Sequence, residues 1–210
     1  MKDKLKEIQN IQYFTKGHRG ILYLGDYKKK KVVIKSERKD SMAIARVENE
    51  INYLKILNPK GIGPKLLFYD KKFTYFVYAY VDGDFLPLFL QHCTKQNKNL
   101  IKKIIKNLFI QCFRMDRMNI DKEEMHHPYK HIIIEKKTHK PIMIDFERCH
   151  KTIDQKNVTQ FCSYIISDFM IKVLKEKGIK VNAEKIINAA RKYKKDIKKQ
   201  NLDKILKNVN

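Results

Sequence analysis

The hydrophobic pattern of the chain changes near residue 83, and this change limits the folds that are open to it. Before that point, apolar residues gather in short runs rich in valine, isoleucine and aromatic side chains, which favour β-strands. After it, longer stretches space their apolar residues three and four apart, as amphipathic helices do. The sequence V-D-G-D at residues 81–84 predicts a turn between the two parts. We therefore expect an α+β fold, with a β-rich first part and a mostly helical second part.

The same patterns predict the individual elements. In the first part we expect strands near residues 14–16, 21–27, 31–35, 65–70 and 73–81. One amphipathic helix is expected over residues 41–57, where apolar side chains recur at Ile44, Val47, Ile51, Leu54 and Leu57. In the second part we expect helices over residues 100–115, 158–177 and 183–209, and short strands at 131–135 and 141–145.

The net charge of +23 is the strongest feature of the composition. It predicts attraction to polyanions such as nucleic acid, nucleotides or acidic protein surfaces. A second interpretation stays open, because most of the charge is lysine spread along the whole chain, alongside abundant isoleucine and asparagine. Such a mixture is also typical of a general bias toward AT-rich codons, which would need no dedicated binding surface.

Several classes of protein are not expected. The opening M-K-D-K-L-K-E-I-Q-N-I-Q-Y-F has no apolar core of the kind that a signal peptide needs, and no stretch reaches about 18 consecutive apolar residues. The four cysteines form no C-x-x-C pair, so neither structural zinc nor a disulfide framework is predicted. We therefore expect a cytoplasmic protein that makes no membrane contact. The cysteines are Cys93, Cys112, Cys149 and Cys162.

The segment P-I-M-I-D-F-E-R-C, residues 141–149, carries an acid at the end of an apolar run. A run of this kind predicts a buried strand, or the end of one. An ionised carboxylate in such a place costs several kcal/mol unless a positive charge meets it. We therefore expect a positively charged group to meet Asp145.

Three further features each allow a structural and a functional interpretation. Lys35 ends the run V-V-I-K, so its amine either snorkels from a sheet edge or faces a ligand. Glu50 precedes core positions of the expected helix, so it either reaches Lys35 or stays solvated. Gly17 and Gly20, in G-H-R-G, either cup a phosphate with backbone amides or simply join two strands.

Taken in order, these phrases resemble the protein-kinase family. K-G-H-R-G-I-L-Y is similar to the glycine loop, V-V-I-K to the strand that carries the lysine, and N-E-I-N-Y-L to the helix that carries the glutamate. Y-A-Y-V-D-G-D-F-L resembles the hinge, and I-D-F-E stands where kinases have D-F-G. Less than a third of the chain follows Asp145, and no A-P-E segment occurs. The chain is therefore most similar to small atypical kinases: the RIO-type, their minimal archaeal relatives predicted to be serine/threonine kinases, and sugar and choline kinases.

This resemblance implies a bilobal fold. The whole chain, residues 1–210, would form a single kinase-like domain with an N-lobe over about 1–82 and a reduced, mostly helical C-lobe over about 83–210. The N-lobe would be an antiparallel β-sheet with one helix.

The resemblance also implies which residues bind ATP and Mg²⁺. Asp145 would hold the metal, and Lys35, steadied by Glu50, would contact the α- and β-phosphates. Glu147 would add a second metal contact or be a surface charge. Backbone amides around Gly17 and Gly20 would cover the phosphates, and the adenine would meet the backbone from Tyr80 to Asp82.

The catalytic loop is where the chain departs from the family. Kinases use H-R-D-x-x-x-x-N, in which the aspartate orients the attacking hydroxyl and the asparagine binds a second metal. Residues 119–134 read N-I-D-K-E-E-M-H-H-P-Y-K-H-I-I-I. Alignment on Ile120 puts the aspartate position at Glu124. Alignment on the following strand puts the asparagine position at His131 and the aspartate position at His126.

We expect Glu124 to be the catalytic base, with Lys130 near the γ-phosphate and His131 as a metal ligand or phosphate contact. The alternative is that His131, like its neighbours His126 and His127, only belongs to a polar loop. A zinc site fits the order of residues less well.

The expected function is that of a Mg-ATP-dependent protein serine/threonine kinase. Two alternatives remain: a nucleotide-binding pseudokinase that joins RNA or a protein complex, and a kinase of small molecules. The expected partners are ATP, a protein substrate, and RNA or an acidic partner bound through the basic surface.

Overall fold

The computed structural model describes residues 4–17, 20–37 and 46–209. The expected α+β class is confirmed, since these residues form a five-stranded antiparallel sheet, two smaller sheets and seven α-helices. The chain divides into two compact units. Unit 1 contains Met1–Asp82 and Met143–Cys149, and unit 2 contains Gly83–Ile142 and His150–Asn210.

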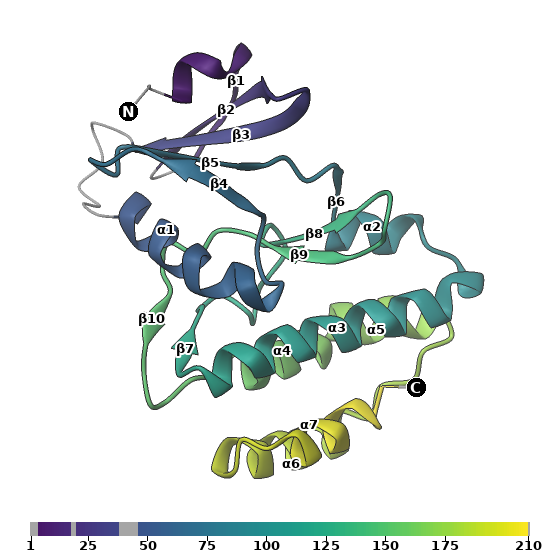
Figure 1. The fold of residues 1–210 in the computed structure, drawn as a ribbon. Helices are drawn as coiled ribbons and strands as arrows, with labels where there is room; N and C mark the ends of the chain where they lie inside the picture. Colours follow the sequence, from purple (N-terminus) through teal and green to yellow (C-terminus); the bar gives the residue numbers. More distant parts are fainter. Residues whose placement is uncertain (1–3, 18–19, 38–45, 210) are drawn as a thin grey trace. The chain divides into compact units, whose positions relative to one another are not determined.

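Unit 1 is built on the five-stranded sheet, whose strands lie in the order β1-β2-β3-β5-β4 (Figure 1). A short 3-10 helix, η1 (Lys4–Glu7), precedes it. The strands are β1 (Gln9–Lys16), β2 (Gly20–Tyr27), β3 (Lys30–Glu37), β4 (Leu66–Tyr69) and β5 (Tyr75–Ala79). β2 and β3 form a hairpin whose two turn residues, Lys28 and Lys29, have φ of 50° and 61°. Positive φ at both positions is typical of the tight turns that suit twisted antiparallel strands.

Alternation along β3 determines which side chains meet the helix of unit 1. Val32 and Ile34 point into one core cluster with Ile8 and Val77. Because successive side chains of a strand point to opposite faces, Val33 and Lys35 point to the other face. That face is covered by α1 (Arg46–Leu57).

The helix α1 packs through the periodic apolar positions that the sequence predicts. Val47, Ile51, Leu54 and Leu57 are all buried, and Glu50 lies within the same stripe. The helix was expected from residue 41, but residues 38–45, including Ile44, lie outside the described part of the chain. After a short 3-10 helix, η2 (Asn58–Lys60), the chain turns through residues with positive φ toward β4.

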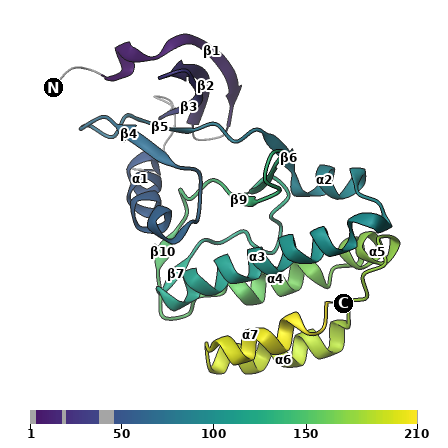
Figure 2. The same cartoon turned by 45° about the vertical axis from the view of Figure 1, so that its right-hand side comes forward.

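Unit 2 is mostly helical. It contains α2 (Leu86–His92), α3 (Lys98–Arg117), α4 (Asn157–Ile165), α5 (Asp168–Glu176), α6 (Ala183–Lys195), α7 (Lys199–Leu206) and the 3-10 helix η3 (Lys95–Asn97). α3 packs against α4 and α7, and α6 packs against α4 and α7 (Figure 2). Among the described residues, no helix combines the length and the apolar character needed to cross a bilayer.

Short strands complete the structure. β6 (Gly83–Phe85), β8 (Ile132–Glu135) and β9 (Pro141–Met143) form a sheet in the order β6-β8-β9, and β7 (Ile120–Asp121) pairs with β10 (His150–Lys151). β9 ends at Met143, so the expectation of a strand through residue 145 was wrong. Asp145 instead has φ of 63°, in the left-handed region that non-glycine residues seldom adopt.

Two of the expected helices are each divided in two. The stretch 158–177 is interrupted because Ser167 adopts an extended backbone and its hydroxyl accepts a hydrogen bond from the Met170 amide, which caps α5. The stretch 183–209 is interrupted at Asp196, which is also extended. Apolar spacing continues across both breaks, so periodicity alone did not reveal them. The helix α2 was not predicted, although Pro87 in its first turn favours a helix start.

A buried carboxylate organises the start of α4. Asp116, at the end of α3, is 1% exposed and accepts hydrogen bonds from the backbone amides of Asn157 and Val158 and from the Tyr193 hydroxyl. The Asn157 side chain donates to Asp116 and to the Ile120 carbonyl. The network thus ties α3, α4, α6 and β7 together.

This network predicts a pH-dependent stability. Burial raises the pKa of Asp116 from 3.8 to about 6, against the opposing effect of its hydrogen bonds. Between these values the folded chain binds more protons than the unfolded chain, so the stability contributed by Asp116 falls as pH rises. The free energy of unfolding of the wild type relative to Asp116→Asn should therefore fall by on the order of 3 kcal/mol from pH 4 to pH 7. Chemical denaturation across this range measures it, and a difference that stays constant with pH would contradict this role of Asp116.

Candidate functional site

The centre of the candidate site is the Lys35 side chain. It extends from β3 on the face covered by α1, at a position paired with Leu22 on β2 and Phe76 on β5. Its side chain is only 13% exposed. A lysine enclosed on both sides by strands needs negative partners nearby, because burial of an unpaired charge is costly.

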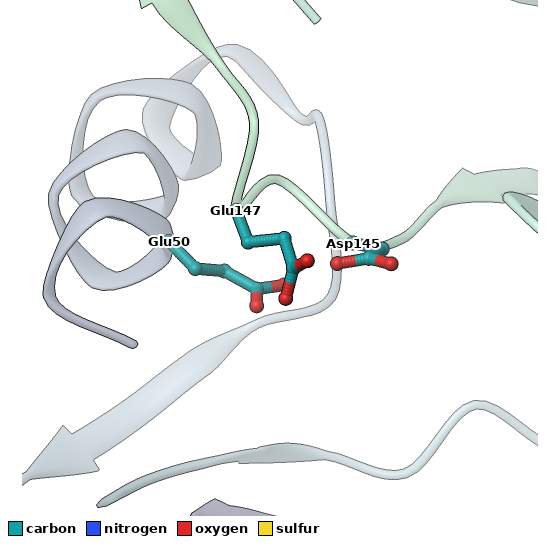
Figure 3. Close-up of side chains that lie close together, drawn as sticks. All are labelled: Glu50, Asp145 and Glu147. Carbon is teal, nitrogen blue, oxygen red and sulfur yellow. The ribbon is translucent and has the colours of Figure 1, made fainter. Parts of the chain in front are cut away.

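Three carboxylates surround the Lys35 ammonium. The distance from Lys35 Nζ to Glu50 Oε2 is 2.5 Å, to Asp145 Oδ1 3.2 Å and to Glu147 Oε2 3.3 Å. Oxygens of the three acids lie within 4.8 Å of one another. Figure 3 shows Glu50 projecting from α1 toward Asp145 and Glu147, which come from the loop after β9. We call Lys35, Glu50, Asp145 and Glu147 the charged cluster; all four belong to unit 1.

Glu50 joins the cluster to the backbone as well as to Lys35. Its second oxygen, Oε1, accepts a hydrogen bond of 3.1 Å from the Phe146 amide. The Phe146 ring is fully buried next to Gly63, where an added Cβ would lie 3.0 Å from the ring and 2.8 Å from Leu54. The absence of a side chain at Gly63 therefore makes room for the Phe146 ring. Asp145 and Glu147 directly precede and follow this buried residue in the loop.

The first turns of α1 hold the same loop through its carbonyls. Asn49 Nδ2 donates to the carbonyl of Glu147 at 2.9 Å and to that of Cys149 at 2.9 Å. Arg46 donates to the Glu147 carbonyl at 3.3 Å. These contacts to the backbone fix the loop without using the carboxylates, whose oxygens remain directed at Lys35.

Burial and charge act in opposite directions on the groups of the cluster. Burial alone would lower the pKa of Lys35, but the charges of Glu50, Asp145 and Glu147 outweigh it and raise that pKa well above its usual value. Burial also raises the pKa of Glu50, opposed by the Lys35 charge. Burial likewise raises the pKa of Tyr78, which lies near the same charges. Lys35 is thus held in its charged form.

The charged cluster has the composition of a site for a divalent cation. One ammonium and three carboxylates give a net charge of −2 when all are ionised, which a divalent cation would neutralise. Carboxylate oxygens are the ligands that Mg²⁺ and Ca²⁺ prefer. Asp145 is the most accessible of the three acids, with 36% of its side chain exposed against 5% for Glu50 and 10% for Glu147. Asp145 and Glu147 are therefore the residues best suited to hold a metal.

The glycine turn lies beside the lysine. Gly17 donates its amide to the Gly20 carbonyl at 2.9 Å, and the residues between them are not described. A Cβ at Gly20 would lie 3.2 Å from Cε of Lys35 and 3.2 Å from the Ser36 carbonyl oxygen. Gly20 thus leaves room for the Lys35 side chain, a structural reason for this glycine that needs no ligand.

The segment that follows β5 is partly engaged in the sheet. The Tyr80 amide donates to the Lys31 carbonyl at 3.2 Å. An adenine contact by Tyr80 would therefore have to use its carbonyl, and any amide contact would have to come from Val81 or Asp82. The predicted role of residues 80–82 stays a prediction.

The expected catalytic loop belongs to unit 2. His131 Nε2 lies 3.4 Å from Glu124 Oε2, so these two predicted residues meet, whereas Lys130 is exposed. Glu123 and Glu124 both have left-handed φ, of 60° and 59°. Within unit 2, the described residues form no group of three potential metal ligands. Its role as a metal ligand stays a prediction.

Glu147 is the member of the cluster that the sequence left undecided. The structure excludes the interpretation that it is a surface charge, since it is 8% exposed and pairs with Lys35. The signals in the sequence were its spacing of two residues from Asp145 and the resemblance of I-D-F-E to the kinase motif. Phe146, the residue between them, is buried, and both flanking acids meet the Lys35 ammonium.

Comparisons with known proteins do not assign the chain to a family. No protein-family model matches the sequence, and a search of curated proteins finds no match.

The cluster predicts a specific consequence of removing its cation. Lys35→Met removes the ammonium that meets Glu50, Asp145 and Glu147, which should lower the free energy of unfolding at pH 7 by about 3–5 kcal/mol. Because carboxylates that lose this nearby positive charge bind protons more readily, the deficit should shrink as pH falls from 7 to 5. Lys31→Met, at an exposed lysine of the same strand, is the matched control and should change little. Urea denaturation at both pH values measures the effect; an equal deficit at pH 5 would contradict the charge explanation.

Proposed function

We propose that this protein is a Mg-ATP-dependent phosphotransferase, an atypical protein serine/threonine kinase similar to the RIO-type. The observation that carries the proposal is the charged cluster, in which Lys35 of β3 lies within 3.3 Å of Glu50, Asp145 and Glu147. A lysine on a sheet, a helix glutamate and an acid next to a buried phenylalanine are the parts that kinases use to bind Mg-ATP.

The order of the elements in unit 1 gives further support. A five-stranded antiparallel sheet with one packed helix is the architecture proposed for the N-lobe. Lys35 lies on the third strand, next to Gly20 of the glycine turn. The bilobal arrangement of units 1 and 2 is part of the proposal.

In this proposal each group of the cluster has a stated role. Lys35 contacts the α- and β-phosphates, and Glu50 keeps its amine oriented and charged. Asp145, assisted by Glu147, holds Mg²⁺, which when bound supplies charge neutralisation at the phosphates. Much of phosphoryl transfer depends on such positioning and neutralisation, so a preformed cluster lowers the reorganisation that binding requires.

The transfer itself needs an acceptor hydroxyl and a base. The hydroxyl oxygen forms a bond to the γ-phosphorus, while the bond from that phosphorus to the β–γ bridging oxygen breaks and ADP leaves. Glu124 takes the hydroxyl proton. His131 Nε2 lies 3.4 Å from Glu124 Oε2, so the His131 ring would help to orient this carboxylate.

The first prediction concerns binding. Wild-type protein should show a rise in melting temperature with ATP and Mg²⁺ together, because a ligand that binds only the native state stabilises it by mass action. Lys35→Met should lose this rise, and ATP without Mg²⁺ should give a smaller one. Differential scanning fluorimetry of each variant with and without ligand measures it. Lys31→Met should respond as the wild type does. A rise that Lys35→Met retains would place the nucleotide elsewhere.

The second prediction concerns catalysis. With [γ-³²P]ATP, wild type should label itself or a protein substrate, and Asp145→Asn should reduce this labelling by at least about 100-fold, equivalent to losing roughly 3 kcal/mol of transition-state stabilisation. Glu176→Gln, at an exposed acid of α5, is the control and should label normally. If wild type binds Mg-ATP but labels neither protein nor metabolites, the protein is a nucleotide-binding pseudokinase. If it labels only metabolites, it is a small-molecule kinase.

A further inference from the structure

The loop after β7 places two consecutive acids in an unusual backbone conformation. Glu123 and Glu124 have φ of 60° and 59°, in the left-handed region. Glycine, asparagine and aspartate adopt this region most readily, and glutamate has no such preference. Conformations of this kind persist where the surrounding structure imposes them, and they gather at functional sites. Contacts from outside these two residues therefore hold the loop in place.

Two side-chain amides of α4 supply such contacts on either side of the two acids. Asn157 Oδ1 accepts a hydrogen bond of 2.9 Å from the Lys122 amide, directly before them. Gln160 Oε1 accepts one of 3.1 Å from the Met125 amide, directly after them. We call Asn157 and Gln160 the amide clamp. Because they lie three residues apart in α4, their side chains leave the same face of the helix.

Hydrogen bonds within the loop add to those of the amide clamp. The Glu123 amide donates to Asp121 Oδ1 at 3.0 Å, and the His127 amide donates to the Glu124 carbonyl at 3.0 Å. The side chain of Met125 is fully buried. The backbone on both sides of Glu124 is thus held by defined acceptors and by packing.

The two members of the amide clamp differ in what else they hold. Asn157 is fully buried and also donates to Asp116 and to the Ile120 carbonyl, so it belongs to the network that joins the helices of unit 2. Gln160 is only partly buried, and among the described residues its side chain makes its hydrogen bond to the loop alone. Replacement of Gln160 therefore tests the loop without dismantling that network.

The conformation of the loop determines where the Glu124 carboxylate lies. Its Oε2 is 3.4 Å from His131 Nε2, which follows from the direction that the left-handed backbone gives to the side chain. A right-handed backbone at the same residue would direct the carboxylate elsewhere. A general base must lie within hydrogen-bond reach of the proton that it takes, and a displacement of about 1 Å can cost roughly 100-fold in rate.

We propose that Gln160 is a positioning residue for Glu124. By holding the Met125 amide, Gln160 Oε1 maintains the left-handed backbone that directs the Glu124 carboxylate. This inference rests on the proposed function, in which Glu124 takes the hydroxyl proton. The hydrogen bonds of the amide clamp do not depend on that function, so the loop and the reaction can be tested separately.

Amide hydrogen exchange, measured by NMR, tests the loop without any substrate. Gln160→Met removes the acceptor but keeps a side chain of similar length, so the Met125 amide should exchange at least about fivefold faster, as expected for the loss of one hydrogen bond. The amide of Leu108, a buried residue of α3, should keep its wild-type rate. Gln160→Glu keeps an acceptor oxygen and should retain the protection of Met125.

Gln200→Met is the matched control, because it makes the same substitution at an exposed glutamine of α7. It should leave the exchange of Met125 unchanged. Exchange of Met125 that is also unchanged in Gln160→Met would overturn the proposal. Faster exchange at Leu108 as well would show that Gln160 maintains the whole fold rather than the loop, and would overturn it too.

The second readout is the rate of phosphate transfer from ATP. Gln160→Met should lower kcat at least about tenfold and leave KM for ATP within about twofold, because the charged cluster is proposed to hold the nucleotide. Glu124→Gln should lower kcat further. Addition of Gln160→Met to Glu124→Gln should then cause little more loss, since the clamp acts through Glu124. The same tenfold loss in both backgrounds would contradict that route.

The two readouts separate a failure of this inference from a failure of the proposed function. A wild type that transfers phosphate to no acceptor would overturn the proposed function, and the role of Glu124 as base with it, even if Gln160→Met speeds the exchange of Met125. An active wild type with an unchanged kcat in Gln160→Met would overturn the positioning role alone. A raised KM for ATP without a fall in kcat would do the same, since it would assign Gln160 to nucleotide binding.

Discussion

The ion pairs of Lys35 are the interaction on which the rest of unit 1 depends. A single ammonium on β3 meets one carboxylate from α1 and two from the loop after β9. It therefore connects a strand, a helix and a loop that are far apart in the sequence. Three acids this close together repel one another, and the Lys35 ammonium offsets both this repulsion and the cost of burying their charges. The arrangement leaves a net negative charge, which is what would attract a divalent cation to the accessible edge of the cluster at Asp145.

The loop that carries two of the acids is held by hydrogen bonds from α1 and by the packing of Phe146. Glu50 and Asn49 hold its backbone, and Phe146 fills the space next to Gly63. Asp145 then adopts a left-handed backbone, a conformation that costs of order 1–3 kcal/mol and persists only where the surroundings impose it. This strained residue is also the most accessible acid of the cluster. We therefore expect that the charge and the position of Asp145 matter more than its contribution to stability. A relaxed strand through residue 145 would direct the carboxylate differently.

Unit 2 uses its buried polar groups differently, to hold helices together. Asp116 accepts hydrogen bonds from the first amides of α4 and from the Tyr193 hydroxyl. Asn157 in turn donates to the Ile120 carbonyl, which holds β7 at the point where the next loop begins. That loop carries the proposed base, Glu124.

The sequence by itself determined the class of fold, the strands of the sheet and the buried face of α1, because each depends on local periodicity. Through the resemblance to the protein-kinase family, it also indicated that Lys35, Glu50 and Asp145 belong together. Only the tertiary structure decided that Glu147 joins them and that the strand stops before Asp145. The breaks at Ser167 and Asp196 were likewise hidden, because apolar spacing continues across them. These features arise from contacts between distant segments, and no local pattern records which buried charge or ring a folded chain will bring next to another.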